Sequence, residues 1–316
     1  MLTDSSINIK NNITGFFGKL TGFADFIKYN ASGKEILTID SWLQEGLALA
    51  RLKFPNEWKS YYDKTAKINF IYPFTDTENI TIGIMCPSYD KSGRSYPFLI
   101  FRNVEKKASE PYYLIPASYN KLFESFEEIL EENKMVQDTA NLKAVIDNLN
   151  HSGTGNPNFL SDYKNFILKT DLNNIFSVDK SEAIQLNDYL GKNIKIYQHL
   201  ICIRFTSIED QSENYSLISF YIQLIQILFK NQNSSPAVFW INFEDNSGLI
   251  FLTFSRPTPK DFIDLLLNSN NTEIDMNLDE QMSLDNGKYL VQDNLIIDYN
   301  LKLAEFLNYV RTHLNS

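Results

Sequence analysis

Two short apolar runs flank a polar loop near residue 90. The first, residues 80–86, is rich in β-branched side chains and nearly free of charge, which predicts a strand buried on both faces. The second, residues 96–101, carries Pro97 near its start, where a strand tolerates proline. Gly93 supplies a left-handed turn position between them. The pattern therefore predicts a strand, a structured loop and a second strand.

Ser88 and Asp90 in this loop can hydrogen-bond their own backbone, and Asp90, Lys91 and Arg94 have no obvious packing role. Polar residues on a loop between rigid strands are common in functional sites. A second reading is that opposite charges lock the loop, since a paired charge can be purely structural. Both readings stay open at the level of sequence.

The aromatic run at residues 13–27 is interrupted by Gly15, Gly18 and Gly22. The spacing does not fit a phosphate-binding loop. That loop requires a glycine, four further residues, Gly-Lys and then Ser or Thr. The glycines instead indicate a strand that another backbone approaches closely, followed by a sharp turn. Asp25 in this turn is either a local cap or a charge beside an apolar wall.

A helix is expected at residues 41–51, beginning with a capping box at Ser41. It is apolar on two faces, which is typical of a helix buried between layers. Arg51 near its end either meets the helix carbonyls and dipole or reaches a carboxylate such as Asp25 or Asp90. Asp25, Arg51, Ser88, Asp90 and Arg94 are thus the candidate charge patch, for partner binding or for structure.

Strands alternate with helices along the rest of the chain, which predicts an α/β fold. We expect a layered sandwich with a central mixed sheet covered by helices on both faces, plus a C-terminal helical extension. Further strands are expected at residues 68–72, 196–205, 236–241 and 248–254, and further helices at 118–133, 138–150, 159–169, 181–190, 215–229, 259–267 and 300–314.

The chain divides into three expected parts. Residues 1–12 are expected to form a flexible tail. Residues 13–267 are expected to form one α/β domain with an internal linker at 151–158. Residues 268–316 read as an acidic connector followed by an amphipathic helix, which docks on its own domain or is offered to another protein.

Charge and cysteine content narrow the classes of function. The 316 residues hold 29 Lys and Arg against 39 Asp and Glu, a formal net charge of −10, so no nucleic-acid partner is expected. Cys86 and Cys202 lie in apolar runs and are expected to be reduced thiols. Neither their spacing nor that of the three histidines matches a metal site, and no cofactor is expected.

No signal sequence and no membrane-spanning run is recognised in the sequence, so a cytoplasmic protein is expected. An enzyme with Ser88 as nucleophile or Asp90 as acid remains an alternative. Its weakness is that a lone serine needs an activating base, and only a distant residue such as His199 could supply one. We therefore expect a binding protein and not an enzyme.

Four blocks of the chain, in order, resemble the TagF family, also called ImpM, of bacterial type VI secretion. They are the glycine-rich residues 15–26, the helix at 42–51, the segment Met-Cys-Pro-Ser-Tyr-Asp-Lys-Ser-Gly-Arg-Ser-Tyr-Pro at 85–97, and Ser-Pro-Ala-Val-Phe-Trp at 235–240. The resemblance covers residues 13–102 best. Thr21, Ala24 and Ala50 depart from the family pattern, which has Pro, Gly and Ser at these positions.

The resemblance implies that the protein regulates secretion, and it implies no catalytic residues. TagF-like proteins are cytoplasmic accessory proteins that act after translation to restrain the secretion apparatus. Their implied partner is the forkhead-associated protein of the system, with a link to a phosphatase and kinase pathway. A structural subunit of the apparatus is a further alternative, and direct membrane insertion is not expected.

Overall fold

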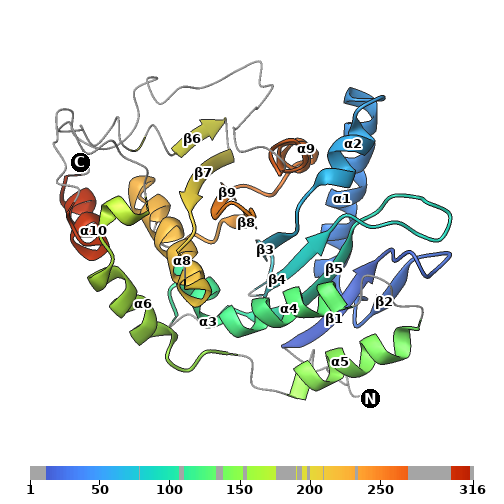
Figure 1. Cartoon of the computed structure of the whole chain (residues 1–316), viewed down its shortest axis with the longest axis horizontal. Helices are drawn as coiled ribbons and strands as arrows, with labels where there is room; N and C mark the ends of the chain where they lie inside the picture. Colours follow the sequence, from blue (N-terminus) through green and yellow to red (C-terminus); the bar gives the residue numbers. More distant parts are fainter. Residues whose placement is uncertain are drawn as a thin grey trace, which may run out of the picture.

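The protein is described here from a computed structural model (Figure 1). The structure describes residues 12–77, 79–106, 110–132, 138–151, 155–175, 190, 194–197, 200–208, 210–231, 234–269 and 300–313. Nearly all of the tail expected at 1–12, the helix expected at 181–190 and the connector expected after residue 268 lie outside these ranges, as do three residues of the linker expected at 151–158.

The strands form one nine-stranded sheet in the order β2-β1-β5-β4-β3-β8-β9-β7-β6. Every pair of neighbours is antiparallel, so the expectation of a mixed sheet was wrong. The reason is that most consecutive strands are joined by short loops, which return the chain in the opposite direction. The strands are β1 (Ile13–Gly18), β2 (Ile27–Tyr29), β3 (Ile68–Pro73), β4 (Asn79–Cys86), β5 (Phe98–Glu105), β6 (Ile194–Tyr197), β7 (Leu200–Thr206), β8 (Ala237–Asn242) and β9 (Ser247–Thr253).

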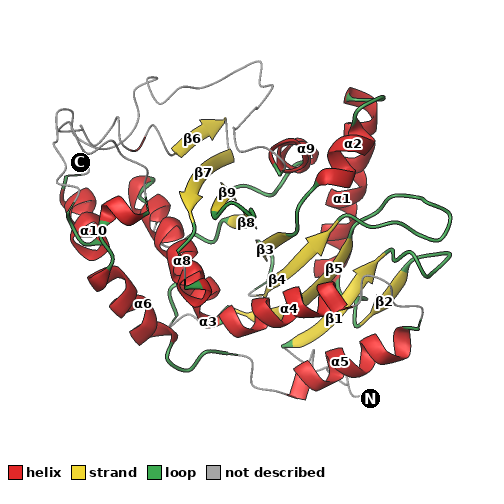
Figure 2. Cartoon of the chain, viewed as in Figure 1, coloured by secondary structure: helices red, strands yellow, loops and turns green. Residues whose placement is uncertain are grey.

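Helices cover both faces of this sheet (Figure 2). Side chains alternate between the faces, so Ile71 joins one core cluster while Phe70 and Tyr72 join the other. One face packs against α1 (Lys34–Lys53), α2 (Trp58–Lys64) and α9 (Pro259–Asn268). The other faces η1 (Tyr112–Leu114), α3 (Ile115–Ser118), α4 (Asn120–Glu132), α5 (Thr139–His151), α6 (Phe159–Lys169), η2 (Leu172–Asn174), α8 (Gln211–Leu228) and α10 (Leu303–Thr312).

Helix α1 begins at Lys34, seven residues before the expected capping box. Ser41 lies within the helix, where its hydroxyl donates to Glu45 Oε1 at 2.8 Å, so its assignment as a helix cap was wrong. The helix extends because Ile36 and Ile39 continue its buried stripe through about two further turns.

The glycines of β1 are required by close backbone approach, as the sequence predicted. A Cβ at Gly15 would lie 2.4 Å from the carbonyl oxygen of Tyr29 on β2. Gly18 has φ of +132°, and a Cβ there would lie 2.1 Å from the carbonyl oxygen of Pro97. Alanine fits neither position, because real Cβ atoms do not approach backbone this closely.

The C-terminal helix α10 docks on its own chain, beside α6 and α8 (Figure 1). Its buried face consists of Leu303, Phe306, Leu307 and Val310. Among the described residues, no helix combines the length and the apolar composition that a bilayer crossing requires.

Helices α1 and α9 pack against each other at a glycine. Gly46 faces the ring of Phe262, to which an added Cβ would come within 2.5 Å. Nearby, the Trp42 indole N–H donates to the carbonyl oxygen of Thr258 at 2.8 Å, just before α9 begins. The absence of a side chain at Gly46 therefore sets the distance between the two helices.

We expect Gly46→Ala to destabilise the protein by about 1–3 kcal/mol, because the methyl group overpacks the contact with Phe262. At an exposed helix position the same change would stabilise by about 1 kcal/mol. Urea unfolding measures the difference. Adding Phe262→Leu should recover part of the loss, and an unchanged or higher stability of Gly46→Ala alone would contradict this packing.

Candidate functional site

The candidate site lies where two loops meet the ends of α1 and α2. The β1–β2 and β4–β5 connections run side by side at the right of the molecule in Figure 1. The Lys91 N–H donates to the carbonyl oxygen of Phe23 at 2.7 Å, and Arg94 Nη2 donates to the carbonyl oxygen of Ala24 at 2.8 Å. The two loops are thus joined directly.

Asp90 is the centre of this arrangement. Its carboxylate is fully buried, and Oδ1 accepts from the N–H groups of Ser92 at 2.9 Å and Arg94 at 3.0 Å. Oδ2 accepts from Arg94 Nε at 2.5 Å and lies 3.0 Å from the ammonium of Lys19. Two backbone donors and two cations therefore satisfy this one carboxylate.

These donors decide the charge of Asp90. Burial alone would raise the pKa of its carboxyl, but the hydrogen bonds from Arg94, Lys19 and Ser92 outweigh it and hold the pKa well below the usual range. Asp90 is therefore ionised at neutral pH. A general acid needs the opposite shift, since it must carry its proton near pH 7.

Ser88 is held by its backbone. It is 8% exposed, and the hydroxyl of Tyr62 accepts from its N–H at 2.9 Å and donates to its carbonyl oxygen at 3.0 Å. Burial raises the pKa of Tyr62, so the phenol stays protonated and keeps both bonds. His199, the base that the catalytic hypothesis invoked for Ser88, lies outside the described residues.

The two remaining predicted residues lie nearby in different roles. The exposed carboxylate of Asp25 accepts from the N–H of Phe26 at 2.8 Å, as a local cap does. Arg51, in the last turn of α1, places its guanidinium carbon 4.7 Å from the centre of the Trp58 ring. Asp90, a carboxylate considered for Arg51, is paired with Lys19 and Arg94 instead.

Lys19 is the residue that sequence reasoning missed. Its side chain is only 8% exposed, and its ammonium also lies 3.5 Å from the carbonyl oxygen of Arg94. A lysine between Gly18 and Leu20, directly after an apolar strand, was the available signal, because a buried ammonium requires a counter-charge.

A cavity of about 600 Å³ opens between these elements, and we call it the cationic cavity. Three aromatic side chains line it, from Phe26, Trp58 and Tyr96. The described lining residues include no acid, and their charged members are the cations Lys19, Arg51, Lys59 and Arg94. Arg51 and Arg94 thus share one concavity, with Asp90 buried beneath it, while Asp25 and Ser88 do not line it.

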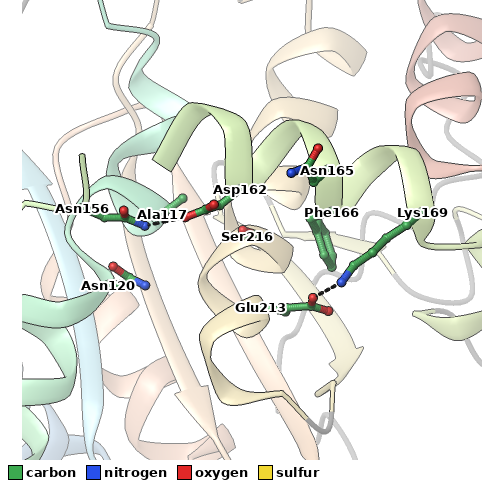
Figure 3. A pocket seen from close by; sticks show the side chains of 9 residues that line it. All are labelled: Ala117, Asn120, Asn156, Asp162, Asn165, Phe166, Lys169, Glu213 and Ser216. Atoms are coloured by element: carbon green, nitrogen blue, oxygen red, sulfur yellow. Dashed lines mark hydrogen bonds and ion pairs between the residues drawn. The ribbon is translucent and has the colours of Figure 1, made fainter. Parts of the chain in front are cut away.

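A second cavity, of about 350 Å³, lies among α3, α6 and α8, far from the predicted site residues in sequence (Figure 3). The charged side chains that line it are paired with other lining residues. Lys169 forms an ion pair with Glu213, and Asn156 donates to Asp162 at 2.9 Å. It therefore offers less unmatched charge to a ligand than the cationic cavity does.

Neither cavity is lined by a cysteine among its described residues. The described residues contain no group of three or more His, Cys, Asp or Glu side chains placed to hold a metal ion. Cys86 and Cys202 are free thiols, as expected, and burial raises the pKa of Cys202 well above its usual value.

We expect Asp90→Asn to lower the melting temperature by several degrees at pH 7. The amide preserves the shape of the side chain but leaves the buried ammonium of Lys19 without its counter-charge. Differential scanning calorimetry measures the change. Asp25→Asn is the matched control, since its carboxylate is exposed, and equal melting temperatures for the two variants would contradict the role assigned to Asp90.

The contribution of Asp90 should depend on pH in a defined direction. Its pKa is lower in the folded than in the unfolded chain, so its stabilising effect is fully present above the unfolded pKa of about 3.9 and is lost as the pH falls toward the folded pKa. The melting-temperature gap between the wild type and Asp90→Asn should be constant from about pH 5 to 8 and narrow below about pH 4. A gap that closes near neutral pH would contradict the assignment.

Comparison with known proteins gives one family match. Residues 15–151 match the family described as TagF N-terminal domain, type VI secretion system-associated. The crystal structure of PA0076 from Pseudomonas aeruginosa PAO1 is similar at 16% sequence identity, over 80% of this chain and 93% of that one, with a TM-score of 0.46. No curated protein matches the chain. All described residues that line the cationic cavity lie within 15–151, the part of the chain that matches the TagF N-terminal domain family.

Proposed function

We propose that the chain is a cytoplasmic accessory protein of type VI secretion that restrains the apparatus after translation by binding one of its components. The family match supports a role in type VI secretion. The resemblance to TagF proteins makes the forkhead-associated protein of the system the expected partner. In this proposal the protein binds another protein and catalyses no reaction.

One observation carries the proposal: Arg51, Lys59 and Arg94 line a surface concavity, and among the described residues only Arg94 of these three forms an ion pair with a carboxylate. The Asp90 network fixes the β4–β5 loop, yet the side chain of Arg94 remains 61% exposed at the cavity. Arg51 and Lys59 are also exposed there. A surface fixed in advance loses little conformational entropy on binding, which favours affinity for a protein partner.

The catalytic alternative has less support from the same residues. Asp90 is ionised and has its oxygens occupied by four donors, and Ser88 is buried with its backbone bonded to Tyr62. Nucleophilic catalysis requires an accessible hydroxyl beside a base. Binding uses the exposed residues of the site, whereas catalysis would have to use the buried ones.

The choice of variant follows from the geometry. Replacing Arg94 would remove an exposed cation and also a partner of Asp90, so a loss of binding could reflect a loosened loop. Arg51 and Lys59 reach the cavity from α1 and α2 without contacting Asp90 directly, and Arg51 packs on Trp58. They test binding with less structural disturbance.

We expect Arg51→Ala with Lys59→Ala to reduce recovery of the forkhead-associated protein at least tenfold. The melting temperature should fall by no more than about 4 °C, since an exposed cation–π contact contributes about 0.5–1 kcal/mol. Affinity purification of the tagged full chain from its native cell, with quantitative mass spectrometry, measures recovery. Lys121→Ala with Lys164→Ala, both exposed on α4 and α6, is the matched control.

Two results would contradict the proposal. In one, the forkhead-associated protein and every other secretion component are missing from the wild-type purification. In the other, deleting the chain lowers secretion, as the loss of a structural subunit of the apparatus would. Restraint predicts the opposite, a rise in secretion on deletion.

A further inference from the structure

The charge of the cationic cavity is opposite to that of the protein. The chain carries a formal net charge of −10, yet four cations and no acid are among the described residues that line the cavity. Three carboxylates bond to lining residues without lining the cavity: Asp90, Asp40, which accepts from the Tyr96 hydroxyl at 2.5 Å, and Asp25, which accepts from the N–H of Phe26. The four cations outnumber these acids.

The buried carboxylate does not neutralise all four cations. Asp90 is shared by Lys19 and Arg94, while Arg51 lies against Trp58 and Lys59 lies 6.0 Å from the ring of Tyr89. A guanidinium that lies over an aromatic ring keeps its N–H donors in its own plane, where they can meet an incoming oxygen. Arg51 and Lys59 therefore retain charge for an outside ligand.

The cavity also offers apolar contact. Phe26 is 41% exposed, although its ring stacks on Phe17 at 5.6 Å and meets the edge of Tyr96 at 4.8 Å. Trp58 is half-buried on the opposite element, α2. An exposed aromatic ring held by other rings is a fixed surface on which a partner's ring or aliphatic side chain can pack.

We propose that the cationic cavity binds an acidic segment of a protein partner, in which carboxylates flank an aromatic side chain. The proposal rests on the proposed function and names the chemistry of the partner at that site. Arginine pairs with carboxylates through two parallel hydrogen bonds, and a cleft of one sign of charge concentrates ligands of the other sign. The net negative charge of the whole chain repels the acidic segment from the rest of the surface. Binding of this segment is therefore specific to the cationic cavity.

The size of the cavity fits this ligand. A volume of about 600 Å³ accommodates a few side chains and not a folded domain. Its walls come from three separate parts of the chain, the β1–β2 connection, the α1–α2 region and the β4–β5 loop. A short extended segment can contact all three at once.

Fluorescence anisotropy with the full chain tests the proposal. The probe is a fluorescein-labelled pentapeptide of four glutamates around one central phenylalanine. We expect saturable binding that weakens as salt rises, because exposed charges are screened within about 10 Å at 0.1 M salt. Arg51→Glu with Lys59→Glu should weaken binding at least tenfold, whereas Lys121→Glu with Lys164→Glu, the same change in net charge on α4 and α6, should change it less than twofold.

Two further peptides test the recognition. Replacing the four glutamates by lysines should abolish binding, and replacing the phenylalanine by glycine should weaken it several-fold. Phe26→Ala should remove the difference between the phenylalanine and glycine peptides, which distinguishes an aromatic contact from a general loss of structure.

The proposal is overturned if the Arg51→Glu with Lys59→Glu variant binds the probe like the wild type, or if the Lys121→Glu with Lys164→Glu variant weakens binding as much as it does. It is also overturned if inorganic phosphate or ATP displaces the probe at concentrations below the dissociation constant of the peptide, because the cavity then prefers phosphate oxygens. The proposed function fails separately. If the probe binds as expected but no secretion component is recovered from cells, the cavity binds acidic peptides and the proposed function is wrong. If the wild type and the Arg51→Glu with Lys59→Glu variant recover the forkhead-associated protein equally, the protein binds this partner at another surface.

Discussion

One buried carboxylate organises the site. Asp90 has exchanged water for two backbone N–H groups and two cations, and a buried charge is tolerated only when it is compensated this fully. The same bonds determine where Lys19 and Arg94 lie and connect the β4–β5 loop to the β1–β2 connection through Arg94. This carboxylate is buried together with the ammonium of Lys19, whereas Arg94 remains exposed at the cationic cavity.

The sequence predicted the part of the site that depends on local pattern. Asp90 and Arg94 stood out because charges between two buried strands lack a packing role. The partnership of Asp90 with Lys19 was not predicted, since it joins loops that are adjacent only in the folded sheet. Lys59 and Trp58 were likewise not recognised as parts of the site, because their position depends on how α2 turns back beside α1.

The fold shows the same division between local and long-range information. Short apolar runs placed β4, β5, β8 and β9 nearly where the structure has them. The direction of the strands was not encoded in those runs, because a strand buried on both faces looks the same in parallel and antiparallel sheets. The start of α1 was misjudged because a serine followed by a glutamine three residues later suits a helix interior as well as a cap.

The two halves of the sheet meet at a single backbone pairing, in which Asn69, Phe70 and Ile71 of β3 lie opposite Trp240, Phe239 and Val238 of β8. The family match ends at residue 151, so β8 lies outside the matched domain. A strand as apolar as β3, left bare at the margin of a sheet, is a template for aggregation. Strand β8 thus covers this margin, and a fragment cut after residue 151 would leave β3 as an exposed edge strand.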